Sequence, residues 1–203
     1  MVPTKKFKLK LTFSELILGS QPGGGSPASD FLKAKALENG VEEAQVAEEA
    51  QTLPEMMEKA TTVFHRDSEG HPLFYNYQIK GMIKEAAGQL NGLGNNKGLK
   101  QKVQNTVFVT TRRIPVHGEF GEMLERPLRA ETMQGPRTCL ARSETIKPGA
   151  TCECEIKVVE LPKFKPDEAM LREFLDYAQC LGFGQWRNSG VYGQFEYELT
   201  PLT

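Results

Sequence analysis

The spacing of the hydrophobic residues changes along this chain in a fixed order, and that order is the strongest constraint on its fold. Near the N-terminus, apolar residues alternate with lysine or threonine over residues 6–13, which is the two-residue period of a strand with one exposed face. Apolar residues then recur at every third or fourth position over residues 79–90, as on the buried side of an amphipathic helix. The chain is therefore predicted to begin with a strand and, after a long interval, to continue with a helix.

The rest of the chain repeats these two periods. Residues 107–114 are rich in β-branched side chains and residues 151–159 alternate, so both segments are predicted as strands. Residues 166–168, Pro-Asp-Glu, are typical of a helix start, and an apolar stripe follows over residues 171–178. Alternation returns over residues 195–199. The order βαββαβ predicts an α+β protein with a ferredoxin-like, or RRM-like, core.

Two stretches do not fit this core. A Gly/Pro/Ser-rich segment, residues 19–27, leads into residues 28–60, which are rich in alanine and glutamate and have helical character. We interpret residues 28–72 as an acidic insertion between the first strand and the first helix. Because 203 residues suit one folded unit, residues 1–203 are predicted to form a single domain around it. The stretch between residue 114 and the third strand is predicted to be irregular.

Composition excludes several classes of protein. No apolar run approaches the roughly 20 residues that a membrane span requires. The basic residues 1–10 lead into an alternating pattern instead of the continuous apolar stretch of a secretory signal, so we expect a cytoplasmic protein. The net charge is only −1, but residues 30–69 are mainly acidic and residues 80–147 mainly basic. Such segregation can create a face that binds polyanions.

The cysteines and the missing motifs argue against a metal or a cofactor. The four cysteines, at positions 139, 152, 154 and 180, lack paired CxxC spacing and have no histidine near enough in sequence for a zinc site. Cys152 and Cys154 share one face of a predicted strand with Ile156 and Val158, which favours buried, reduced thiols. The chain also lacks a phosphate-binding Gly-Lys-Ser/Thr loop, an HExxH motif and a nucleophile elbow.

Four stretches resemble landmarks of the RAMP superfamily, whose members form backbone and processing subunits of CRISPR RNA complexes. They are the turn Leu16-Ile17-Leu18-Gly19-Ser20 after the first strand, the helix start from Tyr77 to Lys84, the segment from Arg137 to Ile156 around Lys147-Pro148-Gly149, and the glycine-rich segment from Gly182 to Gly193. In the last of these, Val191 and Tyr192 separate the second glycine pair, where the family usually has one residue. The resemblance covers most of residues 5–27 and 75–199 and implies a ferredoxin-like fold.

The glycine-rich segment has a physical reason to bind nucleic acid. Glycines permit positive φ angles and close backbone approach, so they can expose amides to phosphate oxygens, while Arg187 adds charge and Trp186 could stack on a base. The glycines meant are Gly182, Gly184, Gly190 and Gly193. Alternatively, these glycines merely end the second helix and turn into the last strand, with Trp186 packed in the core.

The resemblance implies a non-catalytic subunit that binds a guide-like RNA through its phosphates, together with other CRISPR effector subunits or copies of itself. From the path that RNA follows in this family, the resemblance implies that Lys80, Lys84 and Arg187 contact the RNA. Cations neutralise phosphates without precise reaction geometry, so the wider set of candidates also includes Arg112, Arg113, Arg137 and Arg142.

Two alternatives remain open. The first is a metal-independent endoribonuclease that processes guide RNA, in which a histidine activates a ribose hydroxyl. Its candidates are His65 and His71, in a predicted loop, and His117, in another. Asp30, the one acid comparable to those that cleave target RNA in the family, fits a helix N-cap better. No catalytic residue is therefore predicted. The second alternative is a RAMP-fold decoy or assembly protein that binds other subunits without RNA.

Overall fold

The computed structural model describes residues 2–23, 61–92, 97–132, 135–187 and 191–202, with the backbone alone for 128–132 and 135–139. Within these residues the protein has three helices and mostly antiparallel sheets, so the predicted α+β class is confirmed. The helical segment predicted at 28–60, with Asp30, lies outside the described residues.

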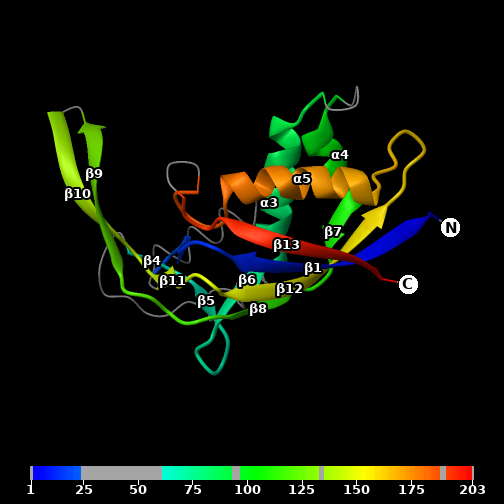
Figure 1. The fold of residues 1–203 in the computed structure, drawn as a ribbon. Helices are drawn as coiled ribbons and strands as arrows, with labels where there is room; N and C mark the ends of the chain where they lie inside the picture. The colour runs from blue at the N-terminus through cyan, green and yellow to red at the C-terminus, as the bar shows by residue number, and fades with distance from the viewer. Residues whose placement is uncertain (1, 24–60, 93–96, 133–134, 188–190, 203) are drawn as a thin grey trace.

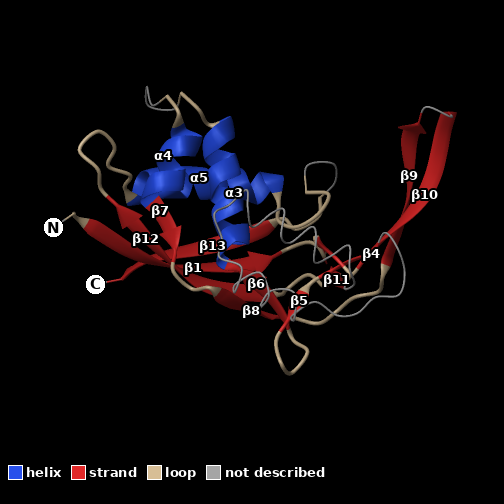
Figure 2. Ribbon diagram, turned by 180° about the vertical axis from the view of Figure 1, so that it is seen from behind, coloured by secondary structure: helices blue, strands red, loops and turns tan. Residues whose placement is uncertain are grey.

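The main sheet has seven strands in the order β13-β1-β12-β8-β6-β5, and β7 also pairs with β12. In chain order the strands are β1 (Thr4–Phe13), β5 (His65–Arg66), β6 (Pro72–Tyr75), β7 (Val107–Val109), β8 (Arg113–His117), β12 (Thr151–Val159) and β13 (Phe195–Leu202). The helices are α3 (Asn76–Gln89), α4 (Leu99–Thr106) and α5 (Glu168–Leu181). All three lie over the same face of the sheet (Figures 1 and 2).

The central strand β1 shows why the sheet has one buried and one open face. Its alternating apolar residues are buried beneath the helices, as predicted: Phe7, Leu9, Leu11 and Phe13. The lysines between them point to the open face, where they meet acids of the neighbouring strands. Lys8 Nζ lies 2.6 Å from Glu153 Oε2, and Lys10 Nζ lies 3.1 Å from Glu198 Oε1. We call these four residues the open-face ladder.

Aromatic rings form the centre of the core. Phe13 contacts Phe74, Phe183 and Phe195 at centroid distances of 6.1, 5.9 and 6.0 Å, and Phe183 lies 4.6 Å from Phe74. Such packed pairs contribute about 0.5–1.5 kcal/mol each beyond the burial of their area. Because Phe183 belongs to the glycine-rich segment, that segment is fixed to the core at its start.

Both predicted helices are confirmed. Helix α3 begins after Tyr75, whose backbone N–H donates to Gln78 Oε1 at 2.8 Å, as in a capping box. Helix α5 begins after Asp167, whose carboxylate accepts from the backbone N–H of Met170 at 2.9 Å. The second helix thus starts where its Pro-Asp-Glu sequence predicts.

The strand predicted at 107–114 is interrupted. Strands β7 and β8 both pair with β12, but residues 110–112 between them are not part of either strand. Two of these residues still form hydrogen bonds with β12. The backbone N–H of Thr110 donates to the carbonyl of Glu155, and the hydroxyl of Thr111 accepts from the N–H of Glu155. The β-branched composition signalled extended backbone correctly, but it could not show that the pairing shifts within the segment.

The stretch predicted to be irregular contains a long hairpin, which corrects that expectation. Strands β9 (Leu124–Thr132) and β10 (Gly135–Ser143) pair with each other and extend away from the main sheet (Figure 1). Their bases join β3 (Gln21–Pro22) and β4 (Thr61–Val63) in a second sheet of order β3-β4-β10-β9. β11 (Thr145–Ile146) pairs separately with β2 (Ile17–Leu18). Proline within β9, at Pro127, is typical of a loop or an edge strand, which hid the hairpin.

Two further corrections concern short elements. Helix α4 was not predicted; in the sequence it directly follows residues 91–98, which are rich in glycine and asparagine, and it buries Leu99, Val103 and Thr106. Residues 61–72, at the end of the proposed insertion, form β4, β5 and the start of β6, and β6 pairs with β8 in the main sheet. This part of the insertion is therefore integrated into the β-structure of the core.

The structure bears out the burial of Cys152 and Cys154, which face the helices from β12. Burial raises the pKa of the Cys154 thiol to about 12, and burial together with the neighbouring Cys154 raises the pKa of Cys152 further still. Cys180, on α5, is exposed.

We therefore expect iodoacetamide at pH 8 to alkylate Cys180 in the native protein and to spare Cys152 and Cys154, because the thiolate is the reactive form. Peptide mass spectrometry reads out each site, and the same reaction in denaturant, where all become accessible, is the control. Native alkylation of Cys152 at the rate of Cys180 would contradict the burial.

None of the helices in the described parts of the chain combines the length and apolar character that crossing a bilayer requires.

Candidate nucleic-acid interface

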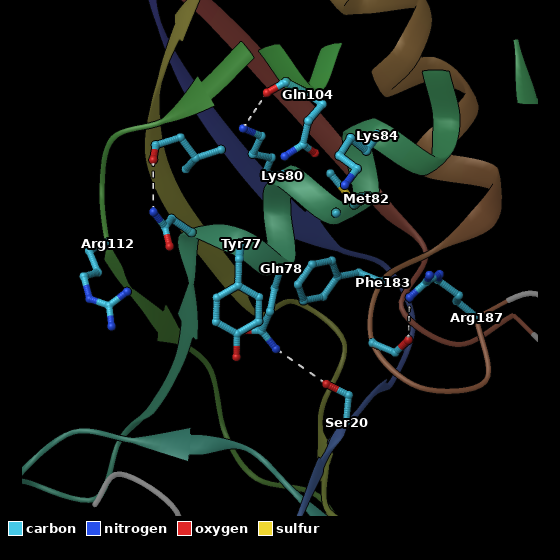
Figure 3. A pocket seen from close by; sticks show the side chains of 14 residues that line it. Ser20, Tyr77, Gln78, Lys80, Met82, Lys84, Gln104, Arg112, Phe183 and Arg187 are labelled. Carbon is cyan, nitrogen blue, oxygen red and sulfur yellow. Dashed lines mark hydrogen bonds between the residues drawn. The ribbon is translucent and has the colours of Figure 1, made fainter. Parts of the chain in front are cut away.

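A groove with a volume of about 540 Å³ opens beside the first turns of α3. Its walls are α3, the end of α4, the connection between β7 and β8, and the start of the glycine-rich segment (Figure 3). We call it the α3 groove. It lies at an edge of the helical layer, and the open-face ladder contributes no residue to it.

Four of the predicted RNA-binding cations line the α3 groove, although they are up to 107 positions apart: Lys80, Lys84, Arg112 and Arg187. Lys80 and Lys84 are one helical turn apart on α3, so their side chains share a face. Arg112 comes from the connection between β7 and β8, and Arg187 from the glycine-rich segment. The structure thus brings cations of three separate segments to one groove.

Lys80 is half-buried in the wall. Its ammonium group donates to the backbone carbonyl of Gln104 at 2.9 Å and lies 4.6 Å from the centroid of the Phe108 ring. Burial, and secondarily the charge of Lys84, lower the pKa of Lys80. The smaller of these two causes is repulsion between the two lysine charges, which a bound anion would relieve.

Arg187 is oriented by two contacts. It donates to the carbonyl of Gly184 at 3.3 Å and forms an ion pair with Glu85 of α3. Both side chains of the ion pair are partly exposed to solvent, and Arg187 lines the groove. Glu85 therefore holds the guanidinium beside α3 while compensating part of its charge.

Aromatic rings support Arg112. Its guanidinium lies 5.1 Å from the centroid of the buried Tyr75 ring, and Tyr75 stacks on Tyr77 with a centroid distance of 6.0 Å. The Tyr77 side chain reaches into the α3 groove between α3 and Ser20 (Figure 3). A cation over an aromatic face is worth about 0.5–2 kcal/mol, enough to fix the position of Arg112.

The glycine-rich segment differs from the expectation that its glycines expose amides to phosphate. Gly182 and Gly193 are buried, and their N–H groups donate to the carbonyls of Ala178 and Leu16. These two glycines serve the close packing of the chain, which the alternative interpretation had foreseen. Gly184 does line the α3 groove, and Gly190 lies outside the described residues.

Trp186 lies on the other side of this segment, toward the hairpin. The guanidinium of Arg126, on β9, lies 5.3 Å from the Trp186 ring and 5.5 Å from the ring of Tyr192. Trp186 is half-buried and does not line the α3 groove. Its predicted role as a stacking platform for a base is therefore not part of this site.

A second link joins the same segment to the second sheet. The side-chain oxygen of Gln185 accepts from the hydroxyls of Thr62 and Ser143, at 2.7 and 2.9 Å. Thr62 belongs to β4 and Ser143 to β10, so Gln185 connects the glycine-rich segment to the base of the hairpin.

The remaining predicted cations lie elsewhere. Arg113 is exposed on β8, and Arg142 on β10 pairs with Glu125 of β9 at 2.7 Å. Arg137 is also on β10, where only the backbone is described. The wider set of candidates is thus divided between the α3 groove, strand β8 of the main sheet and strand β10 of the hairpin.

No histidine lines the α3 groove. His65 was predicted in a loop but is buried in β5, where its ring packs edge-on against Tyr75 at 4.7 Å. His71 is exposed in the turn between β5 and β6, and His117 is exposed at the end of β8. His65 approaches the groove only indirectly, because its Nε2 lies 3.4 Å from the Tyr77 hydroxyl.

Sequence reasoning missed three groove contacts: Glu85, Gln104 and Phe108. Gln104 was missed because α4 was not predicted, although the spacing of Leu99, Val103 and Thr106 is that of a buried helical face.

Among the described residues, the His, Cys, Asp and Glu side chains form no group of three or more that could hold a metal ion.

A comparison of the chain with models of known protein families found no match, and a comparison with curated proteins found none either.

Proposed function

We propose that this protein binds single-stranded RNA in the α3 groove through the phosphate backbone, as a non-catalytic subunit that resembles the backbone proteins of CRISPR effectors. One observation carries the proposal: Lys80, Lys84, Arg112 and Arg187, chosen from sequence as RNA ligands, line the same groove. Clustered cations supply most of the affinity for a phosphate backbone, and they do so without reading its sequence.

The charge distribution supports the α3 groove over the open face of the sheet. On that face Lys8 and Lys10 are paired with glutamates of both neighbouring strands. A strand lying there would meet acids and bases in alternation. Among the described residues, those that line the α3 groove include no carboxylate, and Glu85 forms an ion pair with the lining residue Arg187.

We propose further that β1, α3, β7, β12, α5 and β13 form a ferredoxin-like βαββαβ core. Its support is the strand order β13-β1-β12-β7, antiparallel throughout, with α3 and α5 on one face. A guide-like RNA, with other effector subunits or copies of this chain, would then be the partner, and the cytoplasm the place of binding.

Binding is proposed instead of cleavage because the histidines lie away from the cations. A general base must come within hydrogen-bond reach of the hydroxyl it activates. His65 is enclosed by Tyr75 and Tyr77, and the other two histidines lie outside the groove. Specific cleavage of a repeat RNA in EDTA, lost on substitution of a histidine, would favour the endoribonuclease instead.

The test of the proposal is binding of single-stranded RNA at increasing salt, measured by fluorescence anisotropy. We expect Lys84→Gln to weaken binding several-fold and to reduce the slope of log K against log salt by about 0.7, the value for one phosphate contact on a single strand. Lys84 is partly exposed and its loss leaves the packing intact.

Lys10→Gln is the matched control, because it removes the same charge from the open-face ladder and should leave affinity and slope unchanged. Equal losses in both variants would point to nonspecific attraction. Absence of RNA binding by the unmodified protein at low salt would overturn the proposal in favour of a decoy or assembly protein.

A further inference from the structure

A second groove adjoins the α3 groove at the far end of helix α3. Its volume is about 610 Å³, and it lies between the last turns of α3 and the first residues of α4. The two grooves share Lys84 and Gln104, so they are adjacent at these two residues. We call the second one the α3–α4 groove.

The two grooves follow one stripe of helix α3, which continues to Asn91, two residues after the helix ends. Tyr77, Lys80, Lys84, Gly88 and Asn91 line them at successive steps of three or four residues, and such residues lie on the same side of a helix. At 1.5 Å per residue, the stripe from residue 77 to residue 91 is about 21 Å long. Even at the 3.4 Å rise of a duplex strand, that length spans no more than about six nucleotides.

The lining of the α3–α4 groove selects for a polyanion. Its described lining residues include Lys84 and Lys100 and carry no carboxylate and no apolar side chain. These residues give an apolar peptide no surface to bury against, and they would repel a cation. Gly88 keeps the groove open: a Cβ atom at this position would lie 3.5 Å from Cδ of Lys100, so a longer side chain would fill the space.

The junction of the grooves holds an unsatisfied polar atom. The side-chain oxygen of Gln104 is buried, and no described residue donates a hydrogen bond to it. A buried acceptor without a donor costs about 1–3 kcal/mol. A ribose hydroxyl or a base amino group entering the junction can supply the missing donor.

We infer that the RNA strand bound in the α3 groove continues past Lys84 into the α3–α4 groove, where Lys100 neutralises a further phosphate and Gln104 contacts the nucleotide at the junction. The inference rests on the proposed function and adds α4 to the binding surface. It also gives the strand a path along α3, between the glycine-rich segment and the start of α4.

The test uses a fluorescent uridine RNA of roughly twelve nucleotides, within the range of single-strand site sizes. Lys100→Gln removes the charge at an exposed position, and Gly88→Leu blocks the α3–α4 groove without changing any charge. We expect Lys100→Gln to weaken binding about threefold or more and to lower the salt slope by about 0.7. Gly88→Leu should weaken binding by a similar factor while the α3 groove stays unchanged.

Lys163→Gln is the control, because Lys163 is exposed and lines neither groove. If Lys84→Gln weakens binding while Lys100→Gln and Gly88→Leu bind like the unmodified protein, the extension into the second groove is wrong and the proposed function stands. If the unmodified protein does not bind the RNA at low salt, both fail.

Discussion

Replacing Gly193 with alanine is expected to lower the free energy of unfolding by about 3 kcal/mol or more, from backbone strain and two broken hydrogen bonds. Gly193 has a φ angle of +68°, and an added Cβ atom would lie 1.9 Å from the carbonyl oxygen of Phe183. Backbone atoms cannot move aside as a flexible side chain does. The bonds at risk are those of Gly193 with Phe183 and Leu16, at 2.9 and 2.7 Å.

Gly70→Ala separates the two causes of this loss. Gly70 also has a positive φ angle, +86°, but nothing lies within 4 Å of the added Cβ atom. It should therefore cost only about 1–2 kcal/mol, the conformational part. Thermal unfolding followed by circular dichroism measures both, and a chain of this size loses about 2–4 °C in Tm per kcal/mol. Equal shifts for the two variants would mean that the close packing around Gly193 is wrong.

Reversing the charge of Arg187 is expected to cause the largest loss of RNA affinity. Arg187→Glu removes a cation from the α3 groove, introduces an anion, and releases Glu85 from its ion pair. A hydrogen bond to a charged group is worth about 1.5–3 kcal/mol, which corresponds to roughly a 10- to 100-fold change in affinity. Repulsion between the two carboxylates and the phosphates adds to this loss.

A second substitution, at Glu85, is expected to restore part of the RNA affinity that Arg187→Glu loses. Adding Glu85→Gln to Arg187→Glu removes one of the two carboxylates and should recover part of the affinity. Glu85→Gln alone should bind RNA at least as well as the unmodified protein, because it frees Arg187 from its internal partner. Anisotropy titrations at low salt compare the four proteins, and unfolding curves confirm that each is folded. An unchanged affinity for Arg187→Glu would remove this residue from the RNA site.

How much the sequence can predict depends on whether an element buries one face. Strands β1 and β12 and helices α3 and α5 each bury a periodic set of apolar residues, so their periods identify them. The β9–β10 hairpin extends from the body and contains Pro127, so it carries no such signal. Helix α4 is only eight residues long, too short for its period to stand out.

The candidate site was predictable only in part, for a related reason. Helical spacing alone places Lys80 and Lys84 on one face. The arrival of Arg112 and Arg187 beside them depends on how β7, β8 and the glycine-rich segment pack against α3, which no local pattern encodes. Similarly, a glycine-rich sequence indicates positive φ angles but does not show whether they serve a ligand or, as at Gly182 and Gly193, the packing of the chain itself.

The side chain of Gln185 links the hairpin to the residues that form the α3 groove. Its oxygen is held by hydroxyls from β4 and β10, while Arg187, two residues further along, is held by Glu85 on α3. Three residues of backbone thus bridge the root of the hairpin and the wall of the α3 groove. A displacement of the hairpin root is therefore expected to move Arg187 as well, because only Trp186 separates the two anchored residues.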